Sequence, residues 1–216
     1  MLPNDAKDKA QAELGLRFSE LLGSGVWGEV YAIEGNAESV VKLSTDPTER
    51  LLVSTWRNSV SRGASLAGIV SMETDAFDVG SYEGNTVFAY LRERVEPISK
   101  DISRALPEYR VSDNKPHVRH PDDDRGVAEN AFNRLGSIGA AIAHKRTPKS
   151  KGLKAYSTML VKAELDYPDS YAMTESLGEL ISLGFIAWDC KLTNAGTSRY
   201  GFPKYFDLSI RSLDAI

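Results

Sequence analysis

Asp189-Cys190-Lys191-Leu192-Thr193-Asn194 combines a carboxylate, an amine and a carboxamide within six residues, and Asp207 adds a second carboxylate thirteen residues after Asn194. A pattern this short can arise by chance. Its interpretation therefore depends on whether related patterns lie upstream of it in the chain.

A glycine-rich stretch lies near the N-terminus. It reads Gly23-Ser24-Gly25-Val26-Trp27-Gly28-Glu29-Val30 and lies between two strand-like runs, 17–22 and 29–33. Because glycine has no Cβ, backbone at these positions can approach phosphates closely and present N–H groups to them. On their own, the glycines would fit the turn of an ordinary hairpin equally well.

A lysine inside an apolar strand follows this stretch. Val40-Val41-Lys42 places the amine twelve residues after Val30. With this lysine and the later Asp189 pattern in order along the chain, the ordinary hairpin becomes the weaker interpretation of the glycines.

Taken in order, the three patterns resemble the G-x-G-x-x-G-x-V loop, the V-A-I-K lysine and the D-x-K-x-x-N catalytic loop of protein kinases. The resemblance extends from about residue 17 to Ser209. It implies an α+β, protein-kinase-like fold. Residues 1–95 would form an N-terminal lobe with a five-stranded antiparallel sheet and one helix, and residues 96–216 a reduced, mainly helical C-terminal lobe.

The resemblance also implies ATP and Mg²⁺ as cofactors and a role for each matched residue. Asp189 would be the catalytic base, and Lys191 would steady the transferred phosphate. Asn194 and Asp207 would bind the metal. The residues that would hold the nucleotide, including two from the hinge after the sheet, are Gly23, Gly25, Gly28, Val30, Lys42, Glu93 and Val95.

A helix and two strands are expected after Lys42. Asp46-Pro47 fits the N-cap and first position of a helix that we expect to run to about Arg62. Strands are expected over 76–82 and 86–92, joined by a tight turn. Glu49 is the only carboxylate in the expected helix, and it either pairs with Lys42 or complements the helix N-terminus.

A less favoured partner for the lysine is Glu73, which falls after the expected helix. The second half of the chain is expected to contain helices over 127–144 and 171–183. Gly136 and Gly139 weaken the first of these helices. The other expected features are an exposed excursion over 107–125, a lysine-rich loop over 145–151 and a short strand at Tyr205-Phe206.

Several positions depart from the kinase pattern. Ala187-Trp188 stand where His-Arg is usual, so regulation through a phosphorylated activation loop is not expected. Leu208-Ser209 replace Phe-Gly, and without the glycine a backbone flip is harder. Nine residues follow Asp207, so we expect substrate binding to use other residues, within 98–168.

Lys191 resembles serine/threonine protein kinases more than aminoglycoside-type phosphotransferases, and the small size resembles kinases of some tailed bacteriophages. These likenesses imply protein substrates, including host proteins, and action in the host cytoplasm. Two alternatives stay open: a kinase-shaped protein that binds and modulates a partner without catalysis, and a small-molecule kinase.

Composition adds limits. The 216 residues are 42% hydrophobic, enough for one compact unit or two small lobes. No apolar run approaches the roughly 20 residues that span a bilayer, and the N-terminus is too polar for a signal peptide. A soluble, cytoplasmic protein is therefore expected. The single cysteine excludes an intrachain disulfide, and the net charge of −4 argues against nucleic acid as a partner.

Three other features favour ordinary roles. His117 and His120 precede the acidic run 122–124, but nothing fixes them at a metal-binding spacing. Cys190 is expected to pack behind the catalytic loop instead of acting as a nucleophile. The basic run 145–151 is most simply a solvated loop, with a contact for an acidic substrate and an autophosphorylation site as the alternatives.

Overall fold

The computed structural model describes residues 2–98 and 124–216. These residues form two compact units: the first comprises 2–64 and 70–94, and the second 65–69, 95–98 and 124–216. The division predicted from the sequence was a single break after residue 95, which did not anticipate that 65–69 pack with the second unit. His117, His120 and most of the expected excursion over 107–125 lie outside the described residues.

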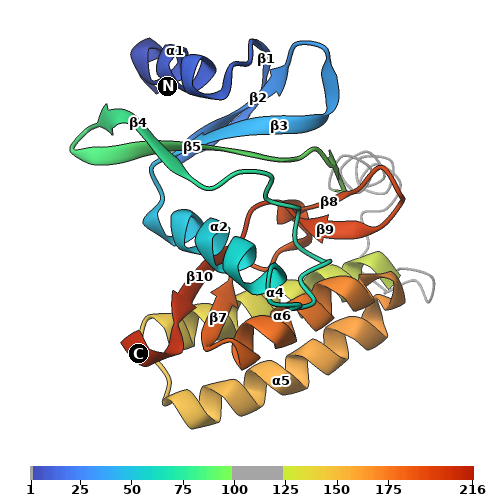
Figure 1. Cartoon of the computed structure of the whole chain (residues 1–216). Helices are drawn as coiled ribbons and strands as arrows, with labels where there is room; N and C mark the ends of the chain where they lie inside the picture. The colour runs from blue at the N-terminus through green and yellow to red at the C-terminus, as the bar shows by residue number, and fades with distance from the viewer. Residues whose placement is uncertain (1, 99–123) are drawn as a thin grey trace, which may run out of the picture. The chain divides into compact units, whose positions relative to one another are not determined.

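The first unit contains a five-stranded antiparallel sheet, as predicted (Figure 1). In the order of the sheet its strands are β1 (Phe18–Ser24), β2 (Gly28–Ile33), β3 (Asn36–Ser44), β5 (Asn85–Glu93) and β4 (Phe77–Tyr82). Glu83 and Gly84 join β4 to β5 with positive φ values of 50° and 81°, which suit a tight hairpin turn. Side chains alternate between the two faces along each strand, so each face can be covered by a different helix.

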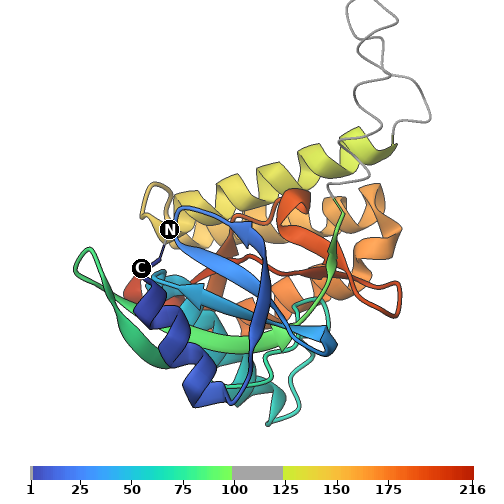
Figure 2. The same cartoon turned by 90° about the horizontal axis from the view of Figure 1, so that it is seen from above.

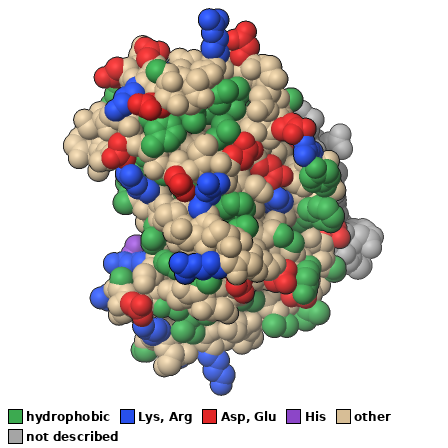
Figure 3. Space-filling view, viewed as in Figure 1, with side chains coloured by type: hydrophobic (Ala, Val, Ile, Leu, Met, Phe, Trp, Pro, Cys, Tyr) green, Lys and Arg blue, Asp and Glu red, His purple; other side chains and the backbone are tan. Residues whose placement is uncertain are grey.

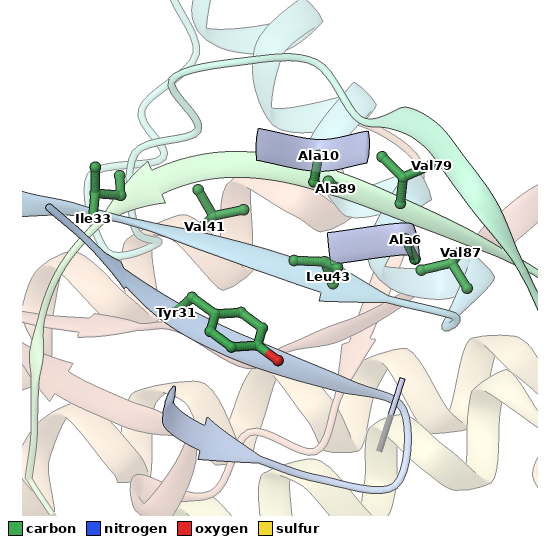
Figure 4. Close-up of a cluster of buried hydrophobic side chains, with 9 residues drawn as sticks. All are labelled: Ala6, Ala10, Tyr31, Ile33, Val41, Leu43, Val79, Val87 and Ala89. Atoms are coloured by element: carbon green, nitrogen blue, oxygen red, sulfur yellow. The ribbon is translucent and has the colours of Figure 1, made fainter. Parts of the chain in front are cut away.

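One face of the sheet packs against helix α1 (Asn4–Leu14), which the sequence did not lead us to expect. Ala6 and Ala10, one turn apart, are buried against the sheet. Figure 4 shows these alanines beside the strand side chains of the same cluster: Tyr31, Ile33, Val41, Leu43, Val79, Val87 and Ala89. The apolar residues of this helix are three alanines and Leu14, which give only a weak periodic signal, and this explains why the helix was missed.

A buried carboxylate ties the N-terminal residues to strand β2 on this face. Glu29 accepts a hydrogen bond from the Leu2 amide at 2.9 Å and one from the Tyr31 hydroxyl at 2.6 Å. Lys7 lies over the Tyr31 ring, 4.6 Å from its centroid. Burial and the bond to Glu29 raise the pKa of Tyr31 to about 12, so the hydroxyl stays a hydrogen-bond donor at neutral pH.

Helix α2 (Pro47–Val60) covers the opposite face of the sheet (Figure 1). It begins as predicted: Asp46 caps it by accepting a hydrogen bond from the Thr48 amide at 2.8 Å, and Pro47 occupies the first position. Leu52 and Val53 are buried. Arg50 pairs with Asp78 of β4 and lies over the ring of Phe88.

The second unit contains the helices α4 (Asp124–Ala143), α5 (Lys149–Asp166) and α6 (Tyr171–Ser182). Helix α5 packs against both α4 and α6, and Figures 1 and 2 show α4 and α5 running side by side. Among the described residues, no helix is long and apolar enough to cross a membrane.

The prediction of a lysine-rich loop over 145–151 is wrong for its second half, because helix α5 begins at Lys149. The buried residues of this helix are Gly152, Tyr156, Met159 and Ala163. They follow helical spacing, but one is a glycine, and Val161 and Leu165 of the same helix are exposed. This mixture hides the amphipathic pattern that would have identified the helix.

Short strands complete the second unit. β7 (Phe185–Trp188) pairs with β10 (Ser209–Ser212) in an antiparallel ribbon. A three-stranded sheet contains β6 (Glu96–Pro97), β8 (Ala195–Thr197) and β9 (Pro203–Tyr205), so the expected strand ends at Tyr205 and does not include Phe206. Residues 65–69 join this unit through Gly68, whose amide donates to Ser176 Oγ at 2.9 Å and whose carbonyl accepts from Tyr205.

Helix α4 lies against the backbone of β7 and of the residues that follow it. A Cβ on Gly139 would lie 2.2 Å from the carbonyl oxygen of Ala187, and one on Gly136 would lie 3.0 Å from the amide of Cys190. The two glycines that weaken the helix by propensity therefore allow this close approach.

We predict that Gly139→Ala lowers the free energy of unfolding by about 2 kcal/mol, because the new methyl group has to displace backbone. Gly178→Ala is a matched control, since Gly178 also lies in a helix but has open space within 4 Å of the point that a new methyl group would occupy. This control should stabilise the protein by about 0.5–1 kcal/mol through helix propensity. Urea denaturation measures both, and equal stabilisation by the two substitutions would contradict the close packing of α4 on β7.

Candidate functional site

The stretch that follows β7 is held in a hydrogen-bonded loop. Asp189 adopts the left-handed conformation, with φ of 61°, which aspartate tolerates better than most residues. Its Oδ1 lies 2.6 Å from Lys191 Nζ, and its Oδ2 accepts from Asn194 Nδ2 at 2.9 Å. The carboxylate, the ammonium and the carboxamide that the sequence singled out are thus in direct contact.

Asn194 links this loop to Asp207. Its Nδ2 also donates to the Asp189 carbonyl at 2.9 Å, and its own carbonyl accepts from the amides of Phe206 and Asp207 at 2.9 and 3.3 Å. Among the described residues, Asn194 Oδ1 accepts no hydrogen bond, so this oxygen can serve as a ligand. Asp189, Lys191, Asn194 and Asp207 are therefore brought together within the second unit.

The β7–β10 ribbon explains why the two aspartates are neighbours. Trp188 pairs with Ser209, so Asp189 leaves one strand where Leu208 and Asp207 lead into the other. Buried side chains flank the exposed Asp207 on both sides, namely Tyr205, Leu208 and Ile210. The residues around Asp207 are thus held by strand pairing, by packing and by the Asn194 carbonyl.

Two buried tyrosines fix the backbone behind the loop. Tyr156 of α5 donates to the Ala187 carbonyl at 3.1 Å, and Tyr205 donates to the Cys190 carbonyl at 3.2 Å. Desolvation by burial raises the pKa of both hydroxyls well above the ordinary value. Both therefore stay protonated and act as donors at any physiological pH.

Cys190 is inert in this setting. The side chain is fully buried, and its sulfur lies 3.6 Å from the Tyr156 hydroxyl. Burial, together with the nearby charge of Asp189, raises the pKa of the thiol to about 12. The thiolate that a nucleophile requires is therefore absent at neutral pH.

The glycine-rich loop of the first unit contains glycines of two kinds. Gly25 donates to the Gly28 carbonyl at 2.9 Å and so closes the turn between β1 and β2. A Cβ on Gly28 would lie 2.3 Å from the Leu43 carbonyl oxygen, so packing against β3 requires this glycine. Gly23 and Gly25 have open space where a Cβ would be, and neither has a positive φ. At these two positions the described fold does not require glycine, whereas close approach by a ligand would.

Lys42 lies on the face of the sheet that α2 covers. In the strand register Val30 pairs with Lys42, and Lys42 pairs with Tyr90, so the three side chains are neighbours on one face. The Lys42 Nζ lies 2.5 Å from Glu49 Oε1, and the two side chains are only 9% and 6% exposed. This pairing identifies Glu49 as the partner that the sequence left open. Glu73 instead accepts a hydrogen bond from Ser39 at 2.7 Å.

The environment of Glu49 favours its charged form. Burial alone would raise the pKa of this carboxyl, but the charges of Lys42 and Arg92 and hydrogen bonds from Lys42 and Ser44 outweigh burial and leave the pKa below its ordinary value. Glu49 makes no capping-box bond, because the Asp46 amide donates to Ser44 Oγ at 3.1 Å. Its carboxylate therefore faces the sheet, where it pairs with Lys42, and does not cap the helix.

The two hinge residues have different surroundings. The Glu93 amide donates to the Ser71 carbonyl at 2.9 Å, so a nucleotide contact from Glu93 cannot use this amide while that bond is made. Val95 belongs to the second unit and packs against Gly196, where a Cβ would lie 2.6 Å from a Val95 methyl group. Of the two residues predicted to form a hinge, Glu93 thus bonds through its amide within the first unit, and Val95 packs within the second.

The predicted residues fall into two sets. The first unit holds Gly23, Gly25, Gly28, Val30, Lys42 and Glu93, and the second holds Val95, Asp189, Lys191, Asn194 and Asp207. Sequence reasoning missed Tyr90 and Ser44, which contact or bond to the Lys42–Glu49 pair. Pairing the predicted strands in register could have revealed Tyr90 as the neighbour of Lys42.

The donor set of the second unit fits Mg²⁺ only in part. In the described part of the chain, no three histidine, cysteine, aspartate or glutamate side chains gather as a metal-binding group. Asn194 Oδ1 and the Asp207 carboxylate offer the oxygen ligands that Mg²⁺ prefers, and phosphate oxygens and waters usually supply the rest. The residues present therefore fit a metal that binds together with a phosphate-bearing ligand. The sequence matches no protein-family model and no curated protein.

We predict that Glu49→Gln destabilises the protein by about 3 kcal/mol near pH 7, because it leaves Lys42 charged and buried without its partner. The ordinary carboxyl pKa is 4.5, and that of folded Glu49 is lower. The contribution of the carboxylate is thus complete above about pH 4.5 and is lost as the pH falls through the lowered value. Urea denaturation at several pH values from about 7 to 3 should show that the difference in free energy of unfolding between the two proteins decreases as the pH falls.

Asp78→Asn is the control for this measurement, because Asp78 lies in the same sheet as Lys42 and its ion pair with Arg50 of α2 is exposed. Its effect should stay below about 1 kcal/mol. If the difference in free energy of unfolding between Glu49→Gln and the unmodified protein did not change with pH, this result would contradict an ionised Glu49.

We also predict that Cys190 resists thiol reagents in the folded protein. Near neutral pH a chromogenic disulfide should react with the native chain at least about a hundredfold more slowly than with the chain unfolded in urea, because the thiol is buried and protonated. Rapid labelling of the native protein would contradict this placement of the side chain.

Proposed function

We propose that the protein is an ATP- and Mg²⁺-dependent phosphotransferase of the protein-kinase-like fold, acting on serine or threonine side chains of proteins. The observation that carries the proposal is the contact set around Asp189: its carboxylate bonds to Lys191 and Asn194, and the Asn194 carbonyl bonds to the amide of Asp207. A binding surface has no need of two carboxylates, an amine and an available amide oxygen in one loop.

Each side chain of the set has a distinct role in this proposal. Asp189 orients the acceptor hydroxyl and takes its proton as the new oxygen–phosphorus bond forms and the bond from the γ-phosphorus to the bridging oxygen breaks, which releases ADP. Lys191, held 2.6 Å from that carboxylate, places a positive charge beside the transferred phosphate. Asn194 Oδ1 and Asp207 would hold Mg²⁺, which neutralises phosphate charge when it is bound.

The first unit supplies groups suited to a triphosphate. Gly23 and Gly25 leave bare backbone for the phosphates, and Lys42 is held by Glu49 with its ammonium in one place. Val30 is only partly buried on the same face, where it can contact the adenine. In the kinase resemblance, residues 1–95 correspond to the N-lobe and residues 96–216 to the C-lobe.

A protein substrate agrees better with the surface charge than a nucleic acid does. Lys and Arg side chains are interspersed with Asp and Glu on the face drawn in Figure 3, and the net charge is −4. A basic stripe, the usual footprint of nucleic-acid binding, is not seen on that face. The proposal includes a cytoplasmic location and host proteins as substrates, in line with the resemblance to bacteriophage kinases.

One observation favours the non-catalytic alternative, a kinase-shaped protein that modulates a partner. Val26 and Trp27, at the tip of the glycine-rich loop, are 91% and 57% exposed. Exposed apolar side chains of this kind often contact another protein. Phosphotransfer needs Asp189 and Asp207, whereas binding to a partner without catalysis does not.

Nucleotide binding is the first test of the proposal. Mg·ATP at millimolar concentration should raise the melting temperature, because it binds the folded state alone. Lys42→Ala should diminish the shift. Absence of any shift in the unmodified protein would refute the phosphotransferase and leave the partner-binding alternative.

We predict that Asp189→Asn and Asp207→Asn separate catalysis from binding. Asp189→Asn should lower phosphotransfer by about 10²- to 10⁴-fold, because the base is lost. It should leave Mg·ATP affinity intact, because Asp189 is not a metal ligand in this proposal. Asp207→Asn should weaken Mg·ATP binding as well, because a metal ligand is lost. Transfer of labelled phosphate to lysate proteins and calorimetric titration measure the two effects.

Asp214→Asn is the matched control, since Asp214 is an exposed aspartate of the same unit outside the contact set. It should change neither quantity. If the biological effect of the protein survives both Asp189→Asn and Asp207→Asn in folded protein, its function lies in a binding surface and not in phosphotransfer.

A further inference from the structure

Tyr90 shares the carboxylate that holds Lys42. Its hydroxyl donates to Glu49 Oε1 at 2.5 Å, and Lys42 Nζ lies 2.5 Å from that same oxygen. In the sequence, Tyr90 falls in the expected strand 86–92, where the hinge-like stretch 90–97 begins, and no role was predicted for its side chain. One carboxylate oxygen thus receives a neutral donor and a charged donor, both from the face of the sheet below α2.

The strand register explains how this arrangement arises. Lys42 of β3 and Tyr90 of β5 are paired residues on neighbouring strands, so their side chains leave the sheet side by side. Glu49 comes from the first turn of α2, which begins five residues after Lys42. The carboxylate therefore bridges two adjacent strand positions instead of one.

The tyrosine ring is itself held in place. Tyr90 is fully buried, and its ring stacks with Phe88 of the same strand, with 6.3 Å between centroids and 22° between planes. Arg50 of α2 lies over the ring of Phe88, 5.7 Å from its centroid. A ring packed in this way presents its hydroxyl from a fixed point, and it can restrict the rotation of the Glu49 carboxylate.

We propose that Tyr90 is a positioning residue for Lys42. Its hydroxyl binds Glu49 Oε1 and holds the carboxylate in place, and this carboxylate in turn holds the Lys42 ammonium where the phosphates of a nucleotide would bind. This inference rests on the proposed function and deepens it. Tyr90 touches no nucleotide in this scheme and acts only through Glu49. Its loss should therefore weaken binding of phosphate-bearing ligands and spare binding of a nucleoside that has no phosphate.

The sheet offers an internal control on its opposite face. Tyr31 donates to the buried Glu29 at 2.6 Å, but the other donor to that carboxylate is the Leu2 amide, and the cation near Tyr31 lies over its ring. Tyr31→Phe and Tyr90→Phe each remove one hydroxyl from one buried tyrosine–glutamate bond. They should cost similar stability, whereas only Tyr90→Phe should affect the phosphate-binding lysine.

The experiment compares the unmodified protein with Tyr90→Phe, Tyr31→Phe and Lys42→Met, using Mg·ADP and adenosine as probes in calorimetric titrations. Tyr90→Phe should weaken Mg·ADP binding by about tenfold, the usual loss for a hydrogen bond to a charged group, and leave adenosine binding unchanged. Lys42→Met should show the same selectivity with a larger loss. Tyr31→Phe should bind both probes as the unmodified protein does.

The double substitution Lys42→Met with Tyr90→Phe tests whether the tyrosine acts through the lysine. It should bind Mg·ADP no more weakly than Lys42→Met alone, because a residue that acts through Lys42 has no effect once the ammonium is gone. Urea denaturation of each variant shows how much stability was lost.

Three outcomes would overturn the inference. If Tyr90→Phe binds Mg·ADP as tightly as the unmodified protein, the tyrosine does not position Lys42, and the proposed function stands. If Mg·ADP and adenosine affinities fall together, the hydroxyl serves the fold and not the lysine. If the unmodified protein binds no Mg·ADP at all, the proposed function fails and this inference fails with it.

Discussion

A lysine ammonium buried in a sheet has to be paired, because a lone charge out of water is far less stable than one in contact with a counter-ion. In the first unit this requirement is met by Glu49, and it constrains much of the local structure. Helix α2 begins three residues after β3 ends, with Asp46 as its cap, so that its first turn lies over Lys42. Ser44, the last residue of the strand, bonds to the cap and contributes to the environment of Glu49.

The same serine connects the glycine-rich loop to this cluster. Ser44 Oγ and Thr45 Oγ1 both lie within hydrogen-bonding distance of the Trp27 carbonyl, as does the Thr45 amide. The tip of the loop is thus anchored through its backbone while the Trp27 ring stays exposed. Polar contacts from a single strand end therefore set both the position of the loop and the position of the carboxylate that holds Lys42.

The features that the sequence predicted are those whose signal is local. The strands follow from apolar runs and turn residues, and α2 follows from Asp46-Pro47. Asp189, Lys191 and Asn194 were identified by a motif of six residues that resembles the kinase catalytic loop. The features that it missed depend on tertiary packing. The buried residues of helix α1 are two alanines, and those of α5 include Gly152. Gly139 is required because the carbonyl oxygen of Ala187, in strand β7, leaves no room for a side chain, and that residue is distant in the chain.

Glu49 shows why a residue can be found by sequence without its role being settled. A carboxylate in the first turn of a helix has two favourable uses, since it can complement the helix dipole and can pair with a nearby cation. Only the position of the helix over the sheet decides between them. Tyr90 is harder still, because its strand by itself predicts a buried aromatic residue and gives no reason for its hydroxyl.

Two buried glutamates of the first unit, Glu29 on strand β2 and Glu49 on helix α2, have different partners. Glu29 and Glu49 each accept a tyrosine hydroxyl, on opposite faces of the same sheet. Glu29 otherwise bonds to a backbone amide, which fastens the N-terminal residues to β2. Glu49 instead pairs with the buried ammonium of Lys42. A buried ion pair contributes little net stability compared with an apolar pair of the same volume. The pair lies on the face that carries Val30, in the unit that also holds two glycines which the described fold does not require, and these observations support the nucleotide ligand that we propose.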